Sequence, residues 1–234
     1  MIYILRHEGL KEEGVYTFSL LGIRYLNASL KDVKGCEFLV LSSKYALSWI
    51  QKTNNLDSLK HLEVLSVGKS TARLCEKAGL KVAFVGSGGI KDLANKLEDR
   101  LKGSCLLYLK AKKSAFSARE VFLDSITKEV VVYETFKKPF FYVPGLRARS
   151  AVVKSLLSLF REESIFIFSA PSHFESFYQA FGWRKDFYAL AIGKTTFEAI
   201  KTSLKTSKNI FCEDGLKECL LLAKKMESKI LTSA

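Results

Sequence analysis

Cysteine and histidine are scarce in this sequence of 234 residues, and their spacing argues against two classes of protein. The five cysteines are odd in number, widely scattered and contain no CxxC pair, so neither a disulfide framework nor a zinc site is expected. The three histidines have no ligand-like neighbours. We therefore expect no metal site, and we expect the thiols to be buried and reduced. These residues are Cys36, Cys75, Cys105, Cys212, Cys219, His7, His61 and His173.

Long apolar runs are also missing. No stretch approaches the roughly 20 apolar residues that span a bilayer. The opening MIYILRHEGL has an apolar run too short for a signal peptide, with charges directly after it. No membrane association is therefore expected, and a soluble cytoplasmic protein is the default. With 48% apolar and 12% aromatic residues, the chain can form ordinary folded cores.

Acidic residues are outnumbered, since 37 Lys and Arg face 24 Asp and Glu, a net charge of +13. The excess is shared: residues 31–134 carry +6 and the remainder carries +7. A distributed positive charge suits an anionic ligand held between two halves, or a broad nucleic-acid surface. Charge that serves only solubility remains an equal alternative.

Continuous apolar strands alternate with amphipathic helices along the chain, which is typical of parallel sheets covered on both faces. The fold class is therefore α/β, with open doubly wound sheets favoured over a barrel. Strands are expected at 2–6, 23–28, 36–42, 61–68, 81–86, 104–110, 128–134, 163–169, 187–193 and 208–213. Helices are expected at 9–21, 43–52, 69–79, 90–102, 117–126, around 150–161, and at 171–182, 195–204 and about 215–226.

One stretch interrupts this alternation. Residues 129–149 begin as a β-branched strand and end in Pro139, Pro144 and Gly145, and these are two of the three prolines in the chain. We interpret the stretch as a crossing between two similar halves. Tyr133 stands where the strand meets the crossing.

The halves repeat two landmarks. Residues 41–47 match 168–174 at an offset of 127, and residues 66–71 match 191–196 at an offset of 125. Each landmark is a strand end, a turn with hydroxyl residues and a helix start, where unpaired N–H groups and the helix dipole bind carboxylate or phosphate. The alternative for each Ser or Thr is a simple helix N-cap.

Nucleotide-binding motifs are incomplete. GKST at 68–71 and GKTT at 193–196 lack the earlier P-loop glycine, since Glu63 and Tyr188 occupy its place. GSGG at 86–89 has Lys91 where the last glycine of the dinucleotide pattern belongs. Neither nucleotide class is therefore supported.

Taken in order, these landmarks resemble the uroporphyrinogen-III synthase family over almost the whole chain. The matching strings are IYILR at the start, LSS at 41–43, SVGKSTA at 66–72, VVVYETF at 130–136, FSAPS at 168–172 and AIGKTTFEAI at 191–200. The chain departs from the family at His7, where proline is usual, at Ala111, where glycine is usual, and at Ala170, where a hydroxyl residue is usual.

The resemblance implies two flavodoxin-like domains with parallel sheets, joined by a two-stranded β linker. Residues 1–30 and 137–234 would form a discontinuous domain, and 31–136 the inserted one. The linker strands would lie at about 27–35 and 134–146. By resemblance, the protein would be a monomer.

The resemblance also implies a cyclising hydro-lyase without a cofactor. Its substrate would be hydroxymethylbilane, a polycarboxylate that is dehydrated and closed with inversion of ring D to uroporphyrinogen III, in heme and tetrapyrrole biosynthesis. Tyr133 would hydrogen-bond the departing hydroxyl or protonate it as a general acid. The substrate would be bound by Arg6, Ser42, Ser43, Ser70, Thr71, Lys110, Ser169, Ser172, Lys194, Thr195 and Thr196.

Two other functions remain open at this stage. A non-catalytic two-domain module could bind a small anion in an interdomain cleft, because fold alone does not specify chemistry. A nucleic-acid-binding protein would need aromatic residues interleaved with Lys and Arg on one surface. The stretch at 110–119 comes nearest to that pattern, but it is more typical of a loop that enters a helix, so nucleic acid is not an expected partner.

Overall fold

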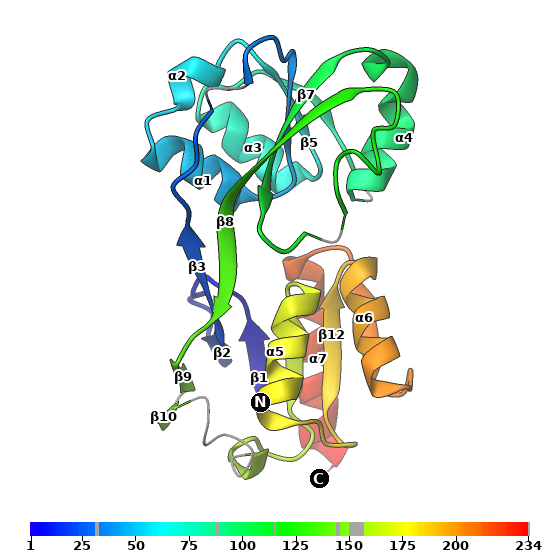
Figure 1. Cartoon of the computed structure of the whole chain (residues 1–234). Helices are drawn as coiled ribbons and strands as arrows, with labels where there is room; N and C mark the ends of the chain where they lie inside the picture. Colours follow the sequence, from blue (N-terminus) through cyan, green and yellow to red (C-terminus); the bar gives the residue numbers. More distant parts are fainter. Residues whose placement is uncertain (31–32, 88, 115, 144–145, 150–156, 234) are drawn as a thin grey trace. The chain divides into compact units, whose positions relative to one another are not determined.

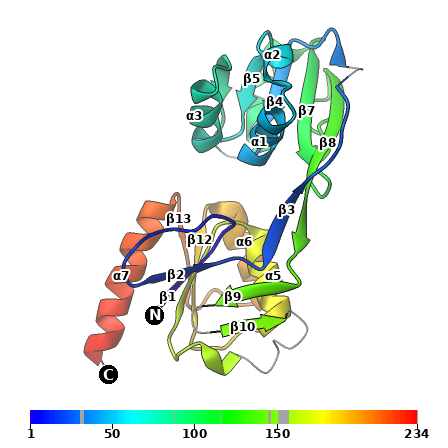
Figure 2. The same cartoon turned by 90° about the vertical axis from the view of Figure 1, so that its left-hand side faces the viewer.

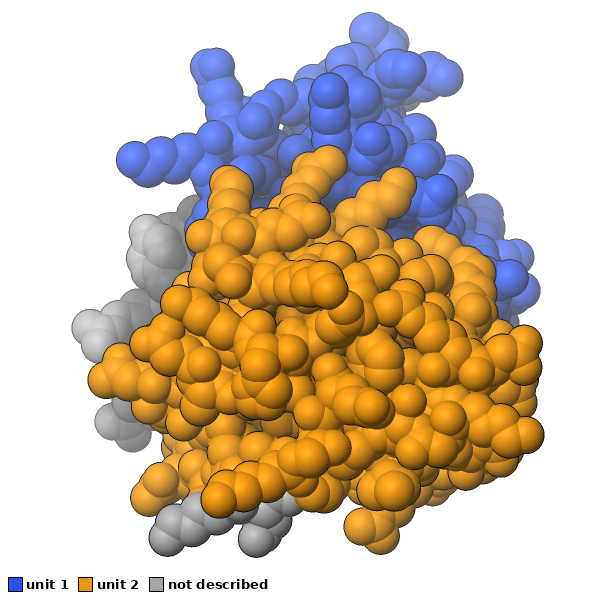
Figure 3. All heavy atoms as spheres, turned by 90° about the horizontal axis from the view of Figure 1, so that it is seen from above, with its two compact units in different colours: residues 1–22, 136–234 blue, residues 23–135 orange. Residues whose placement is uncertain are grey.

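A computed structural model describes residues 1–30, 33–87, 89–114, 116–143, 146–149 and 157–233. The chain forms two compact units, which Figure 3 shows in different colours: unit 1 is residues 1–22 with 136–234, and unit 2 is residues 23–135. The first boundary falls at 22/23, ahead of the boundary after residue 30 that the sequence suggested.

Unit 1 contains a five-stranded parallel sheet in the order β13-β12-β11-β1-β2. Its elements, labelled in part in Figure 1, are β1 Ile2–Leu5, β2 Val15–Phe18, β11 Ile165–Phe168, α5 Pro171–Phe181, β12 Tyr188–Ile192, α6 Lys194–Leu204, β13 Ile210–Glu213 and α7 Leu216–Ser233. It also holds a short 3-10 turn, Leu157–Leu159, and a hairpin of β9 Phe140–Val143 with β10 Leu146–Arg149.

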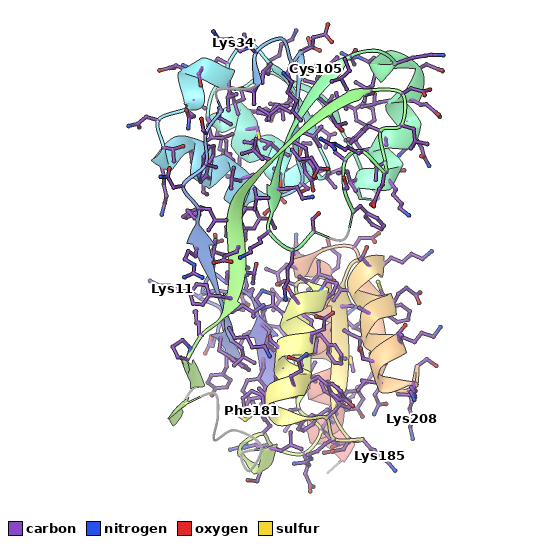
Figure 4. The ribbon with its side chains drawn as sticks, viewed as in Figure 1. Lys11, Lys34, Cys105, Phe181, Lys185 and Lys208 are labelled. Carbon is purple, nitrogen blue, oxygen red and sulfur yellow. The ribbon has the colours of Figure 1, made fainter. Side chains whose placement is uncertain are left out.

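The central strands of unit 1 are apolar because both faces of the sheet are covered. Figure 2 shows α7 on one side of the sheet and α5 and α6 on the other. Alternate side chains divide accordingly: Tyr3 and Phe166 join the cluster of α5 and α6, whereas Ile4 and Ile167 join that of α7. Phe181, labelled in Figure 4, ends α5 and is buried in the first cluster.

Unit 2 contains a six-stranded sheet in the order β3-β8-β7-β4-β5-β6. Leu39 and Leu107 pack with α1 and α3 on one face, and Val40 and Leu106 pack with α4 on the other. The elements are β3 Leu21–Tyr25, β4 Phe38–Leu41, α1 Lys44–Lys52, α2 Leu56–Leu59, β5 Glu63–Ser66, α3 Lys69–Lys77, β6 Val82–Val85, α4 Ile90–Leu101, β7 Cys105–Ala111 and β8 Ile126–Lys137.

Both sheets have the same spatial plan. Unit 1 has the flavodoxin strand order 2-1-3-4-5 when its strands are counted along the chain. In unit 2 the strands β4, β5 and β6 correspond to β11, β12 and β13, and β7 and β8 correspond to β1 and β2. The two units are therefore circular permutations of one arrangement, and the predicted α/β class with parallel sheets is confirmed.

The strands β3 and β8 carry both chain crossings between the units. Leu26 N–H donates to Val132 O at 2.9 Å and Lys138 N–H donates to Leu20 O at 2.8 Å, which makes the pair antiparallel. A Cβ at Gly22 would collide with the Phe136 ring, so the small residue allows this close approach. The partner of β8 thus lies at 20–26, ahead of the expected linker segment 27–35.

Two expected helices are wrong. Residues 9–21 contain β2 in place of a helix, because Gly14 at φ +74° ends the preceding loop and the β-branched and aromatic residues after it pair with β1. Residues 117–125 form turns and bends, in which Ala118 and Phe122 pack into the core on the α4 face, and Ile126 already begins β8. Most of the expected helix around 150–161 lies outside the described residues.

The cysteines are free, but only four of the five are buried. Cys36, Cys75, Cys105 and Cys219 lie in the cores, whereas Cys212 on β13 is exposed, so the expectation of buried thiols is wrong there. Cys105, labelled in Figure 4, begins β7. Among the described helices, none is long and apolar enough to cross a membrane.

Candidate functional site

The carboxyl ends of β4, β7 and β8 bring several hydroxyl side chains together in unit 2. Ser42 Oγ lies 3.0 Å from the hydroxyl of Tyr108, a buried residue of β7. Ser43 Oγ accepts a hydrogen bond from Tyr45 N–H at 3.2 Å and so caps α1. The Ser43 side chain also hydrogen-bonds Tyr133.

Tyr133 reaches this group through an irregularity in β8. The β7–β8 register pairs Lys110 with Val131 but Ala111 with Tyr133, which leaves Val132 as an extra residue. Val132 and Tyr133 are consecutive, yet both pack into the α1–α3 core, against the usual alternation of a strand. A bulge re-aims side chains in this way, and here it turns Tyr133 toward α1.

Burial raises the pKa of Tyr133, and the hydrogen bond from Ser43 opposes that rise. The phenol is 8% exposed, and its ring centroid lies 5.7 Å from that of Tyr45. A neutral phenol is both donor and acceptor, so this side chain can donate a hydrogen bond to an oxygen that gains negative charge.

Lys110, expected to bind substrate, is paired within unit 2. Its Nζ lies 2.7 Å from Glu129 Oε2, and both side chains are mostly buried, at 14% and 19% exposed. Glu129 also accepts hydrogen bonds from Ser117 Oγ at 2.7 Å and from the Ala118 backbone N–H. Burial alone would raise the pKa of Glu129, but these donors outweigh it and lower that pKa.

The two GK turns open α3 and α6, as the sequence predicts. Gly68 and Gly193 are the N-caps, and neither has a side-chain hydrogen bond to cap its helix. Ser70 and Thr195 are exposed, whereas Thr71 and Thr196 are 7% and 3% exposed. The hydroxyl residues thus lie inside the first turn and are not N-caps, and the backbone N–H groups of these turns can face an anion.

The start of α5 in unit 1 is a third helix start without a side-chain cap. Its N-cap is Ala170, also without a side-chain cap. Ser169 Oγ instead donates to Leu5 O at 2.9 Å, which ties β11 to the end of β1, and Ser172 is exposed. Arg6 directly follows β1 at the same sheet edge, 3.5 Å from Glu8.

The structure therefore gathers Ser42, Ser43 and Tyr133 in unit 2, and Arg6, Ser169 and Ser172 at one edge of unit 1. It adds residues that sequence reasoning missed. Tyr108 and Tyr45 flank the serines of β4 and α1. His7 and His173 contact each other beside Arg6. The repeated landmarks hold a signal for two of these residues, because Tyr45 and His173 lie one and two residues after the first residue of a repeated helix. Tyr108 and His7 lie outside the landmarks.

Outside these strand ends, the described residues form a hollow but no group of side chains that could hold a metal ion. A hollow of about 440 Å³ lies beside the C-terminal half of α6, at the opposite end of that helix from Gly193. It is lined by Glu198, Lys201, Thr202, Lys205, Thr206 and Ser207. No group of three or more His, Cys, Asp or Glu side chains that could hold a metal ion gathers among the described residues.

Comparison with known proteins assigns the chain to a family. The model of the family described as uroporphyrinogen-III synthase HemD matches residues 10–213, which span most of both units. The chain belongs to the uroporphyrinogen-III synthase family. The resemblance seen in the sequence is thus confirmed. No curated protein sequence gives a significant match.

Solved structures of uroporphyrinogen-III synthases share the fold. The enzyme from Helicobacter pylori is 24% identical, with a TM-score of 0.71 over 97% of this chain and 100% of that one. A mutant enzyme from the extremely thermophilic bacterium Thermus thermophilus is 15% identical, with a TM-score of 0.62 over 97% of this chain and 99% of that one. At these identities the likeness establishes the fold, and the family model carries the assignment.

Proposed function

We propose that this chain is a uroporphyrinogen-III synthase. It converts hydroxymethylbilane to uroporphyrinogen III by dehydration and ring closure with inversion of ring D, as a cyclising hydro-lyase of heme and tetrapyrrole biosynthesis. The observation that carries the proposal is the family match over residues 10–213. Nothing favours the alternative of a non-catalytic anion-binding module.

The proposed binding groups suit a substrate with many carboxylates. The described starts of α3, α5 and α6 lack side-chain caps, so unpaired first-turn N–H groups are available to anions. In α5 this leaves the N–H of Ser172, because Pro171 has no N–H and His173 N–H donates to Ala170 O. The net charge of +13 is shared between the two sequence halves and raises the local concentration of such a substrate. The proposed binding residues are Arg6, Ser42, Ser43, Ser70, Thr71, Lys110, Ser169, Ser172, Lys194, Thr195 and Thr196.

Two members of this set are already engaged. Lys110 would have to leave Glu129 before it could pair with a substrate carboxylate, because its ammonium is held at 2.7 Å. The Ser169 hydroxyl donates its hydrogen bond to Leu5 O. Toward a substrate it can therefore act as a hydrogen-bond acceptor while this bond is kept. Backbone N–H groups are therefore the stronger part of the proposed binding set.

Tyr133 is the proposed catalytic residue. The hydroxyl of the bilane leaves as water, so it must gain a proton, and the cation that remains is attacked by the substituted carbon of ring D. Because burial raises the pKa of Tyr133, complete transfer of its proton is costly. Its proposed role is a hydrogen bond to the departing oxygen, held in place by Ser43.

The protein is further proposed to act in the cytoplasm as a monomer, without a cofactor. The enzyme proposal is tested by supplying freshly generated hydroxymethylbilane and separating the uroporphyrin isomers after oxidation. The expected result is an excess of isomer III over a control without protein. Formation of isomer I alone, at the rate of spontaneous closure, would reject the proposal.

A further inference from the structure

Two histidines face each other at the carboxyl edge of the unit 1 sheet. The ring centroids of His7 and His173 are 4.6 Å apart, with the ring planes at 63°. His7 lies two residues beyond β1, and His173 is the third residue of α5. His173 is only 2% exposed, whereas His7 is partly exposed and lies against it.

One nitrogen of the His173 imidazole has no partner among the described residues. Nδ1 is buried and makes no hydrogen bond to any residue that the structure describes. The backbone of this residue is satisfied, since its N–H donates to Ala170 O at 3.1 Å and its carbonyl accepts from Ser176 Oγ at 3.0 Å. A buried polar atom without a partner is unfavourable, so a ligand that supplies a partner is favoured here.

The surroundings of His173 are positive. Burial lowers the pKa of His173 to about 3, and the charges of His7, Arg6 and Lys138 act in the same direction. The positive end of the α5 dipole adds to this field. Arg6 has an acidic neighbour in Glu8, which is 57% exposed and 3.5 Å from the Arg6 guanidinium. Such a field repels a metal cation and attracts an anion.

We propose that His173, with His7 and Arg6, forms a carboxylate-binding subsite at the start of α5. The inference rests on the proposed function, and its ligand is one carboxylate of the bilane or of the cyclised product. The carboxylate accepts a hydrogen bond from Nδ1–H, pairs with Arg6 and lies at the N-terminus of the helix. The His7 ring moves aside to admit the ligand.

The subsite also predicts proton uptake. With the anion in place, its negative charge favours the imidazolium form of His173, so the pKa of this side chain rises on binding. His7 gains the same partner and shifts in the same direction. Arg6 stays charged throughout, Lys138 also acts on His173, and Glu8 is paired with Arg6.

The three histidines of the chain make a direct experiment possible by NMR of their imidazole protons. His61 lies in unit 2 on an exposed position and serves as the internal control. The intact protein is titrated with uroporphyrin, which retains the carboxylate side chains, and in a separate arm with inorganic phosphate. We expect uroporphyrin to shift the His7 and His173 signals and to raise the midpoint of His173 by more than about one pH unit, with His61 unchanged.

An unchanged His173 signal at saturating uroporphyrin would overturn the proposal. A shift with phosphate but not with uroporphyrin would overturn it as well, since the site would then hold an adventitious ion only. Either failure leaves the proposed function standing as long as the wild-type protein makes isomer III. If uroporphyrin shifts the His7 and His173 signals but the protein makes no isomer III, the proposed enzyme activity is rejected and the carboxylate-binding subsite is retained.

Variants separate binding from packing. His173→Gln keeps a polar side chain but cannot become a cation or place a donor where Nδ1 lies, and we expect it to weaken the uroporphyrin-induced shift of His7 and to raise KM about tenfold, with kcat within about twofold. His61→Gln is the matched control and should change neither. Should His173→Gln unfold, His7→Ala tests the same subsite. A uroporphyrin affinity for His7→Ala equal to that of the wild type would contradict the proposal.

Discussion

The Ser43 hydroxyl links the start of α1 to β8, because it caps α1 through Tyr45 N–H and hydrogen-bonds Tyr133. A matching contact joins Ser42 to Tyr108 on the neighbouring strand at 3.0 Å. Tyr133 packs in the core on the α1–α3 face of the sheet, whereas Tyr108 packs in the core on the α4 face. In the proposed mechanism only the Tyr133 hydroxyl acts on the substrate.

Tyr133→Phe tests that difference. We expect kcat for isomer III to fall between about tenfold and a hundredfold, because a hydrogen bond to the departing oxygen is lost. Stability should fall by only about 1 kcal/mol, since one buried hydrogen bond is removed. Tyr108→Phe is the matched control, with a similar loss of stability and turnover near that of the wild type. Equal turnover losses in the two variants would show that packing, not chemistry, is affected.

The Lys110–Glu129 pair predicts a strong coupling in unit 2. Lys110→Met leaves Glu129 mostly buried without its cation and should destabilise the protein by about 2–4 kcal/mol. Lys110→Met combined with Glu129→Gln should regain a large part of that loss, because the uncompensated charge is gone. Urea unfolding of the wild type, the single variants Lys110→Met and Glu129→Gln, and the double variant measures the coupling. Additive losses would contradict the pairing.

His173 predicts a pH-dependent stability. Its pKa is about 3 in the folded protein, below the ordinary value of 6.5, so the unfolded chain binds the proton more readily. The folded state therefore loses stability as pH falls from about 6.5 toward 3, by at most about 1.4 kcal/mol per pH unit from this group. His173→Gln should flatten the curve of unfolding free energy against pH in this window, whereas His61→Gln should not. Parallel curves for the wild type and His173→Gln would refute the assignment.

The repeated GK turns differ in backbone conformation. Gly193 has φ +82°, whereas Gly68 has φ −153°, and both have open space where a Cβ would lie. Gly193→Ala should therefore cost about 1–2 kcal/mol, because a left-handed conformation strains an L-residue. Gly68→Ala should cost less, because its extended backbone is open to any residue. Equal midpoints for the two variants in thermal unfolding would contradict this difference.

The cysteines predict a graded reactivity. Burial raises the pKa of Cys36 and of Cys219 to about 12 and that of Cys75 to about 11, so these thiols stay protonated and covered in mildly alkaline buffer. Cys212 is exposed and should react first with a thiol reagent in the native protein. Reaction of the native protein with the reagent should therefore begin with a fast phase from Cys212, and Cys212→Ser should remove that phase. Survival of that phase in Cys212→Ser would contradict the burial of the other four.

Much of the fold could be predicted from periodicity. The apolar runs at 36–42, 104–110 and 163–169 contain β4, most of β7 and β11, because strands covered on both faces need continuous apolar sequence. The glycine turns predicted the helix start at Lys69 and placed the second start at residue 195, one residue after the observed start at Lys194. The segment 9–21 was misassigned, since a short strand at the sheet edge leaves no apolar run long enough to outweigh a polar, helix-compatible loop.

The sequence by itself determined the α/β class, the internal repeat and the family, because these rest on local patterns that survive in order along the chain. The tertiary structure alone decided the bulge that turns Tyr133 toward Ser43, the pairing of Lys110 with Glu129 and the contact of His7 with His173. Each of these joins residues on different elements, and the distance between such residues depends on strand register and packing. A local pattern of residues therefore does not predict that distance.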